Sequence, residues 1–165
     1  MTMKSNVAMK LSNNTTNILK NFSQINQSIL IKEGNKLKTI SVMKNILAEA
    51  EVEEDFEKDF AIYDLNQFLS GLSLYDAPDL DFGDTYLTIR DGRRRAKYFF
   101  ADPDVIVSPP EKEITLPTRD VCFTVATQQL DKLLKAASIY QVPDLSAVGR
   151  NGKIELVVRD KKNDT

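Results

Sequence analysis

The sequence predicts an α+β protein made of repeated units, in which helices cover one face of mostly antiparallel sheets. The first observation is an internal repeat: residues 73–80 (SLYDAPDL) recur as residues 138–145 (SIYQVPDL), with five of eight positions identical. The second is a shared apolar spacing in three predicted helices, each followed by several short strands. Helices that bury one side against antiparallel strands form layered α+β proteins.

Composition excludes several classes of function. The chain has 165 residues, of which 42% are hydrophobic and 28% charged, as in ordinary globular proteins. Its net charge is −2, so any binding of nucleic acid depends on how the charges are distributed. The chain contains no histidine, which removes the most common general base and metal ligand. We therefore expect no catalytic residue, no metal site and no cofactor.

The single cysteine and the length of the apolar runs indicate the cellular location of the protein. Cys122 has no partner for an internal disulfide, and within the run VCFTV we expect it to be a small buried residue. No apolar run approaches the roughly 20 residues that span a bilayer. The opening residues lack the hydrophobic core of a signal peptide. We expect a cytoplasmic protein without membrane contact, whose residues 1–8 form a flexible extension.

The first predicted helix follows residues 11–16, which are rich in helix N-cap types. Strands are predicted at residues 28–31 and 37–42, joined by a tight turn at residues 33–36. Residues 43–50 fit either a helix or a strand. One apolar face of the helix is formed by Ile18, Leu19, Phe22 and Ile25.

An acidic stretch follows, in which seven carboxylates of residues 49–59 accompany the single Lys58. Acidic and apolar residues alternate there, which predicts a strand with one solvated face. The alternative is a metal site, in a carboxylate- or metal-dependent hydrolase that uses residues 51–59. We favour the strand, because no glycine-turned calcium loop is present.

The second helix follows a strand predicted at residues 60–64 and ends before Pro78. Strands are then expected at residues 80–82, 86–89 and 96–100, with a hairpin turn at Asp91-Gly92 between the last two. The run 93–97 (RRRAK) is the densest basic patch. Its position predicts solvated turn charge, with phosphate binding as the alternative. The apolar face of the helix comprises Phe68, Leu69, Leu72 and Tyr75.

Three prolines in residues 102–112 predict an extended connector, which we place at residues 105–117. A strand is expected at residues 119–125, a third helix at 127–140, and a hairpin whose second strand is 154–158. The apolar face of the third helix is predicted to comprise Leu133, Leu134, Ala137 and Tyr140.

The polar faces of the helices differ in charge. The position opposite the apolar face is Lys20 in the first helix, Ser70 in the second and Lys135 in the third. Acidic residues concentrate in the predicted strands and turns instead. The pattern indicates basic helices and acidic sheets, although lysine is also simply a good helix former.

Several strings of residues resemble one known family. They are residues 9–12 (MKLS), 15–22 (TTNILKNF) and 60–69 (FAIYDLNQFL), together with Ala101-Asp102-Pro103. They resemble the sliding clamps of T-even-type bacteriophages, which are the processivity factors of the phage DNA polymerase. The resemblance extends from Met9 to about Asp160. It implies a DNA-clamp fold of βαβββ units.

The resemblance also implies domains and a function. Two units would form an N-terminal domain at residues 9–104, and one unit an incomplete C-terminal domain at residues 118–165. Such a protein encircles duplex DNA without sequence preference and tethers the replicative DNA polymerase, as a homo-trimer placed by a clamp loader in the host cytoplasm. The implied DNA-facing residues are Lys10, Lys20, Lys132, Lys135 and Arg119. The implied partner-binding residues are Val105, Ile106 and Val107.

One departure from the family concerns the number of units. The family has four units per subunit, and this chain has about three. We expect either a fragment of a longer reading frame or a shortened variant. The alternative function is a clamp-fold interaction module, or a clamp fragment, that does not form a closed ring.

Overall fold

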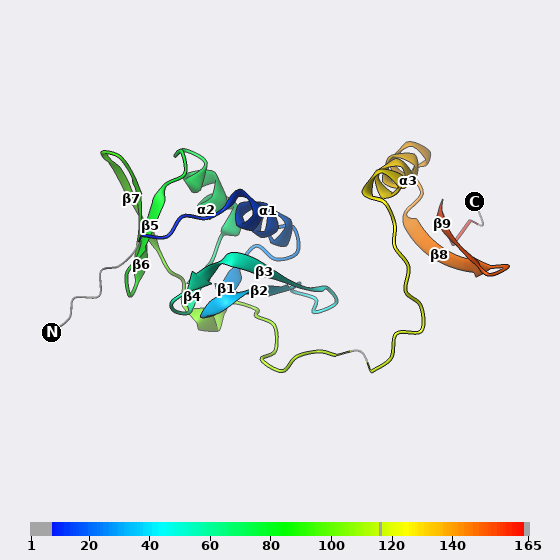
Figure 1. Ribbon diagram of the computed structural model, residues 1–165, viewed down its shortest axis with the longest axis horizontal. Helices are drawn as coiled ribbons and strands as arrows, with labels where there is room; N and C mark the ends of the chain where they lie inside the picture. Colours follow the sequence, from blue (N-terminus) through cyan, green and yellow to red (C-terminus); the bar gives the residue numbers. More distant parts are fainter. Residues whose placement is uncertain (1–7, 116, 164–165) are drawn as a thin grey trace. The chain divides into compact units, whose positions relative to one another are not determined.

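The computed structural model describes residues 8–115 and 117–163. The chain divides into two compact units, Met1–Glu113 and Ile114–Thr165, shown in Figure 1. Each unit is described in turn.

Two helices of the first unit begin at side-chain caps. Ser12 accepts a hydrogen bond from the backbone N–H of Thr15 at the start of α1 (Asn13–Phe22), and Asp64 does the same for Gln67 at the start of α2 (Leu65–Leu72). These bonds satisfy donors that the first turn of a helix leaves unpaired. The predicted helices are confirmed, and their buried residues are Thr15, Leu19, Phe22, Leu65, Phe68 and Leu69.

The strands of the first unit pair only in antiparallel fashion. β1 pairs with β4, β2 pairs with β3, and β5, β6 and β7 form a three-stranded sheet in that order. A short 3₁₀-helix, η1 (Pro103–Val105), follows β7. The predicted α+β class is confirmed. The strands are β1 (Ile29–Ile31), β2 (Gly34–Ile40), β3 (Leu47–Phe56), β4 (Phe60–Ile62), β5 (Asp79–Phe82), β6 (Tyr86–Asp91) and β7 (Arg94–Phe99).

The two helical halves of this unit exchange strands. β4, which precedes α2, pairs with β1, which follows α1, and Leu30 lies opposite Ala61. In return Met9, which precedes α1, pairs with β5, which follows α2: Met9 and Leu80 exchange backbone hydrogen bonds of 3.0 and 2.7 Å. Each half therefore completes the backbone pairing of the other.

One hydrophobic core joins the two halves. Leu37, Ile62 and Leu87 are fully buried in it, and the helices contribute the residues named above. α1 lies beside α2 and against β3 (Figure 1). The ring of Phe60 lies 5.0–5.6 Å from the rings of Phe56, Phe82 and Phe100, a spacing typical of favourable aromatic pairs.

The predicted hairpin between residues 28–31 and 37–42 is wrong. β1 and β2 are consecutive in sequence but belong to different sheets. Gly34 begins β2 with a φ of 105°, which few residues other than glycine adopt, and there the chain leaves the first sheet for the second. The ambiguous residues 43–50 form a turn and then the start of β3.

The second unit contains α3 (Thr127–Tyr140) and a hairpin of β8 (Asp144–Arg150) and β9 (Lys153–Arg159). The bounds of α3 match the prediction. Asn151 and Gly152 connect the two strands with φ of 50° and 71°. Two positive φ values in a two-residue loop are typical of the type I′ turn, whose twist suits a hairpin.

Three expectations for the second unit are wrong. The residues of the predicted strand 119–125 have no regular secondary structure, because within residues 8–115 and 117–163 no strand lies beside them to share hydrogen bonds. Cys122 is exposed rather than buried for the same reason. Leu134 and Tyr140, predicted on the apolar face of α3, are exposed because no second helix packs against α3 among the described residues of this unit.

Candidate nucleic-acid interface

The outer faces of α1 and α2 carry amides, hydroxyls and one lysine, and neither helix contains a carboxylate. Their apolar side chains turn toward the core, which leaves the polar ones outward. Such a surface offers hydrogen-bond donors to phosphate oxygens without the repulsion that carboxylates would add. The exposed residues are Asn13, Asn14, Asn17, Lys20, Asn21, Asn66, Gln67 and Ser70.

Lys20 lies in the last turn of α1, with its side chain exposed. It makes no ion pair with any residue that the structure describes. Ser70, its counterpart on α2, is exposed as well, so the predicted orientation of both positions is confirmed. A cation in the last turn also interacts favourably with the helix dipole, so Lys20 contributes to the stability of α1.

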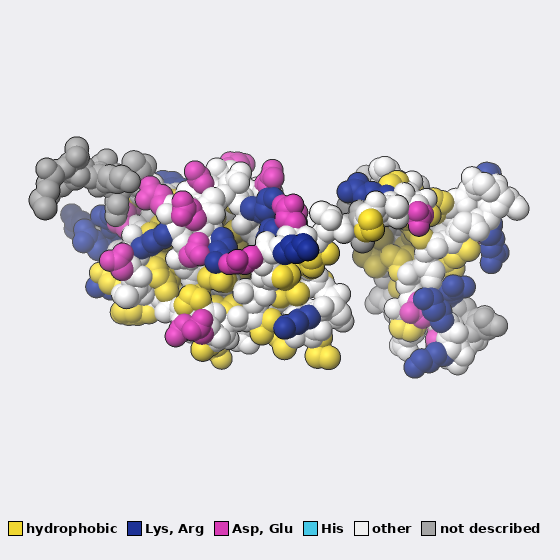
Figure 2. Space-filling view, turned by 90° about the horizontal axis from the view of Figure 1, so that it is seen from below, with side chains coloured by type: hydrophobic (Ala, Val, Ile, Leu, Met, Phe, Trp, Pro, Cys, Tyr) yellow, Lys and Arg dark blue, Asp and Glu magenta, His cyan; other side chains and the backbone are white. Residues whose placement is uncertain are grey.

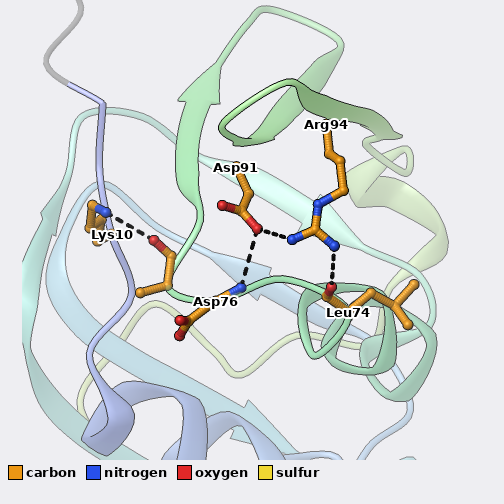
Figure 3. A network of polar contacts seen from close by, with 6 residues as sticks. Lys10, Leu74, Asp76, Asp91 and Arg94 are labelled. Carbon is orange, nitrogen blue, oxygen red and sulfur yellow. Dashed lines mark hydrogen bonds and ion pairs between the residues drawn. The ribbon is translucent and has the colours of Figure 1, made fainter.

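Lys10, in contrast, makes contacts that stabilise a loop of the first unit. Its ammonium group donates to the carbonyl of Ala77 at 2.9 Å (Figure 3). It also lies 3.4 Å from a carboxylate oxygen of Asp79. Ala77 has a φ of 48°, which is uncommon for a residue with a side chain. Lys10 therefore fastens the loop between α2 and β5.

One residue of the basic run 93–97, Arg94, contacts the same loop. Arg94 pairs with Asp91 and donates to the carbonyl of Leu74 at 3.3 Å, and its guanidinium lies 5.3 Å from the centre of the Tyr75 ring. Asp91 also accepts from the backbone N–H of Asp76. Figure 3 shows the loop held between Lys10 and this hairpin. The repeated segment 73–80 is thus a fixed part of the scaffold.

The candidate basic residues of the second unit are exposed. Lys132 and Lys135 stand three positions apart on α3, so they are neighbours on its surface. Arg119 belongs to the segment without regular structure. Within the described residues none of the three forms an ion pair.

One acidic residue of β3 behaves differently from its neighbours. Glu51, Glu53 and Asp55 face solvent, as predicted, but Glu54 is only 8% exposed. The Glu54 carboxylate accepts hydrogen bonds from the backbone N–H of Ser12 and the hydroxyl of Thr15, at the start of α1. Glu54 is therefore a long-range cap on this helix.

The pKa of Glu54 reflects this position. Burial by itself raises the pKa of the carboxyl. The hydrogen bonds from Thr15 and Ser12 act in the opposite direction, and together they hold the pKa of Glu54 below its ordinary value. The residue is consequently ionised at neutral pH, with its charge directed at the positive end of the α1 dipole.

The acidic stretch does not gather into a metal site. Across residues 8–115 and 117–163, no three potential metal-ligating side chains (His, Cys, Asp or Glu) converge. The outward carboxylates of β3 are spread along the strand, and the Glu54 carboxylate is hydrogen-bonded to Ser12 and Thr15 at the start of α1. The structure therefore offers no support to the metal-dependent hydrolase alternative.

The predicted partner-binding residues pack differently from one another. Ile106 is buried, Val105 is exposed, and the carbonyl of Val107 accepts a bond of 3.2 Å from the side chain of Asn26. Residues 108–111 then line a cavity of about 520 Å³. Its other lining residues are Leu30, Lys32, Glu33, Lys36, Lys38 and Asp59.

Each of the three lysines that line this cavity has an acidic partner, which for Lys36 is Glu113 at 3.6 Å. Lys32 pairs with Asp59 at 2.9 Å, and Lys38 with Glu49 at 3.5 Å. The hydrogen bond from Lys32, together with one from the backbone of Glu33, lowers the pKa of Asp59. The cavity therefore combines apolar surface with polar groups of nearly balanced charge.

None of the helices in the described part of the chain has the length and apolar character required to cross a bilayer.

Comparison with known proteins supplies the family. The sequence profile of the DNA polymerase processivity factors matches residues 10–108. The chain belongs to this family. It is 35% identical over 159 residues to the sliding clamps of Escherichia phage RB69 and Enterobacteria phage T4, which covers 95% of this chain and 69% of each relative.

A third relative is the sliding clamp of Vibrio phage KVP40. It is 31% identical over 141 residues, covering 83% of this chain and 63% of the relative. The chain thus spans about two thirds of the length of these curated relatives. The profile match includes Lys10, Lys20 and the residues from Val105 to Val107, whereas Arg119, Lys132 and Lys135 lie beyond it.

Proposed function

We propose that this member of the processivity-factor family works as a sliding clamp, which contacts duplex DNA through its helices and tethers the replicative DNA polymerase. One observation carries the proposal: α1 and α2 present an outer face without carboxylates, on which Lys20 has no acidic partner among the described residues. Contacts of this kind go to the phosphate backbone, so they do not depend on base sequence.

The distribution of charge supports this orientation. Four outward acidic residues of the first unit, Glu49, Glu51, Glu53 and Asp55, lie on β3, whose other face packs against α1. In the second unit basic residues outnumber acidic ones, and Lys132 and Lys135 are the lysines of α3. The acidic excess of the β2–β3 sheet and the carboxylate-free helices α1 and α2 direct a polyanion toward these helices. Of the five candidate residues, Lys20, Lys132 and Lys135 fit DNA contact best, because Lys10 is engaged with Asp79 and Ala77.

The partners follow from the same proposal. The polymerase and the clamp loader would dock beside the connector, where Val105 is exposed next to the cavity lined by residues 108–111. Closure around DNA would require a ring of subunits, which in this proposal is a homo-trimer. The work would take place in the host cytoplasm and use no catalytic residue or cofactor of this chain.

The test is a charge reversal, Lys20→Glu with Lys135→Glu. Its control, Lys44→Glu with Lys153→Glu, changes the same net charge at exposed positions outside the helices. We expect the first variant to bind a duplex of arbitrary sequence more weakly, and the slope of log affinity against log salt to fall in magnitude by about two. Fluorescence anisotropy in a salt series measures both quantities. Equal slopes in the two variants would show that the helices do not carry the DNA contact.

A polymerase extension assay tests the functional consequence. The helix variant should support shorter products than the parent chain, and the control variant should match the parent. Unchanged product lengths in the helix variant would contradict the proposed role of Lys20 and Lys135.

One observation favours the interaction-module alternative. In the second unit both edges of the β8–β9 hairpin lack a neighbouring strand among the described residues, which is an arrangement that recruits other chains. Light scattering separates the possibilities. A stable trimer supports the ring, whereas a monomer or a dimer favours the module.

A further inference from the structure

The sheet formed by β5, β6 and β7 has an outer face that the proposed function does not use. On β7, Ala96 and Tyr98 pack against the hydrophobic core. Because side chains alternate along a strand, the residues beside them point away from the core. These residues, which we call the outer strip, are all exposed, and they are Arg95, Lys97 and Phe99.

The charges of this sheet do not cancel on the outer strip. Residues 79–99 contain four carboxylates and five basic side chains. All four carboxylates are paired: Asp79 with Lys10, Asp81 with Arg90, Asp84 with Lys58 and Asp91 with Arg94. The cations of this sheet that have no acidic partner within residues 8–115 and 117–163 are Arg93, Arg95 and Lys97. Figure 2 shows basic side chains at the end of the first unit that carries β7.

Two aromatic rings lie beside these cations. Phe99 is 66% exposed, and the ring of its cross-strand partner, Tyr86 of β6, has its centre 5.6 Å away. The ammonium group of Lys97 lies 4.4 Å from the centre of the Tyr86 ring, a cation–π contact that holds the cation next to the rings. The strip therefore combines positive charge and flat apolar groups over about 14 Å of extended strand.

We propose that the outer strip binds single-stranded nucleic acid. Each repeat of such a strand supplies a phosphate, which the cations attract, and an unpaired base, which can stack on an exposed ring. A duplex supplies the phosphates but offers only the edges of its bases, so it leaves Phe99 uncovered. An acidic peptide supplies the charge without a flat group at each repeat. The combination of cations and rings therefore favours the single strand.

This inference goes beyond the proposed function, which assigns duplex contact to the helices. Phe68 of α2 packs against Tyr98 on the core side of β7, with ring centres 5.0 Å apart. The helix thus lies on one side of the sheet and the outer strip on the other. The core separates the two surfaces, so each can be changed by substitution without the other.

The first test measures the affinity of the full 165-residue chain for a fluorescein-labelled 12-nucleotide oligothymidylate, by anisotropy in a salt series. Arg95→Gln with Lys97→Gln removes two charges of the strip and adds no carboxylate. We expect at least a fivefold loss of affinity at low salt, and a slope of log affinity against log salt that falls in magnitude by about 1.4.

The matched control is Arg150→Gln with Lys44→Gln, which also removes one arginine and one lysine at exposed positions, but outside this sheet. The control should keep the slope of the parent chain. Equal losses in the two variants would show that the strip has no special part in binding.

The second test detects stacking at Phe99. The sequence contains no tryptophan, so Phe99→Trp introduces a single fluorescent reporter into the strip. Oligothymidylate should quench this fluorescence, because a base that stacks on the indole ring replaces water there. Met43→Trp is the matched control: Met43 is 82% exposed on the turn between β2 and β3, so its reporter should not be quenched.

Three outcomes would overturn the proposal. Unchanged fluorescence of Phe99→Trp with oligothymidylate excludes stacking on the strip. Equal quenching by a 12-base-pair duplex assigns the strip to duplex DNA, and quenching by polyglutamate assigns it to an acidic protein segment. Lys20→Glu with Lys135→Glu, introduced into Phe99→Trp, should leave the quenching intact. A failure of duplex binding in that variant therefore concerns the proposed function alone.

Discussion

The long-range cap on α1 gives the sharpest prediction from the structure. Glu54→Gln keeps the size of the side chain but removes its charge and replaces one acceptor oxygen by an NH₂ group. The backbone N–H of Ser12 and the hydroxyl of Thr15 both donate to Glu54. The amide can accept only one of these bonds, so one donor near the start of α1 loses its partner.

The expected loss follows from these contacts. A hydrogen bond to a charged group contributes about 1.5–3 kcal/mol. A carboxylate at a helix N-terminus adds about 0.3–1 kcal/mol. Removing a buried charge returns part of its desolvation cost, so we expect the free energy of unfolding of the first unit to fall by about 2 kcal/mol. For a domain of this size that corresponds to a melting temperature lower by about 10 °C.

The pH dependence has a definite sign. The pKa of Glu54 is lower in the folded chain than in the unfolded chain, so the folded state favours the ionised form. The stabilisation is fully present above the unfolded pKa of about 4.3 and disappears as the pH falls through the folded value. The difference between the parent and Glu54→Gln should be constant near neutral pH and shrink in acid.

Urea unfolding, followed by circular dichroism between pH 7 and pH 3, measures these quantities. The matched control is Glu53→Gln, which changes the same group on the solvent face of the same strand and should stay within about 0.5 kcal/mol of the parent. A Thr15→Val partner variant completes a double-mutant cycle. Equal effects of the two glutamine variants, or a Glu54 difference that persists unchanged at pH 3, would refute the capping role.

Two further predictions concern other parts of the first unit. Asp64→Ala removes the cap of α2 and should lower the free energy of unfolding by about 1–2 kcal/mol in urea, whereas Asn66→Ala, at an exposed site of the same helix, should change it little. A result in which both variants match the parent would contradict the capping geometry. Arg94→Ala releases the loop after α2 and should speed chymotrypsin cleavage after Tyr75 several-fold. Arg93→Ala, at the exposed hairpin tip, should not, and equal cleavage of the two variants would refute the anchoring role.

Elements that depend on local interactions were predicted well. The helices follow from apolar residues repeating about every 3.6 positions and from the caps Ser12 and Asp64. The β6–β7 and β8–β9 hairpins follow from turn residues such as Asn151-Gly152. The outward positions of Lys20 and Ser70 are confirmed because helix geometry alone places them opposite the apolar face.

Features that depend on distant parts of the chain were missed. The pairing of β1 with β4, and of Met9 with Leu80, joins segments that no local pattern connects. Glu54 lies in a run of acidic residues, and nothing near it in the sequence marks it as the partner of Ser12 and Thr15. Lys10 fits a basic DNA contact by residue type, but its partners Asp79 and Ala77 lie about 70 positions away.

The sequence by itself determined the fold class, the three helices, the turns of the β6–β7 and β8–β9 hairpins and the family, because each depends on local spacing or on contiguous strings of residues. Only the tertiary structure decided which strands pair, which charged groups are already engaged, and which apolar faces are covered. The contrast between Leu69 and Leu134 illustrates the reason. The two positions belong to the same repeat, but burial depends on the surface that lies opposite, and a strand such as 119–125 forms only where another strand shares its hydrogen bonds.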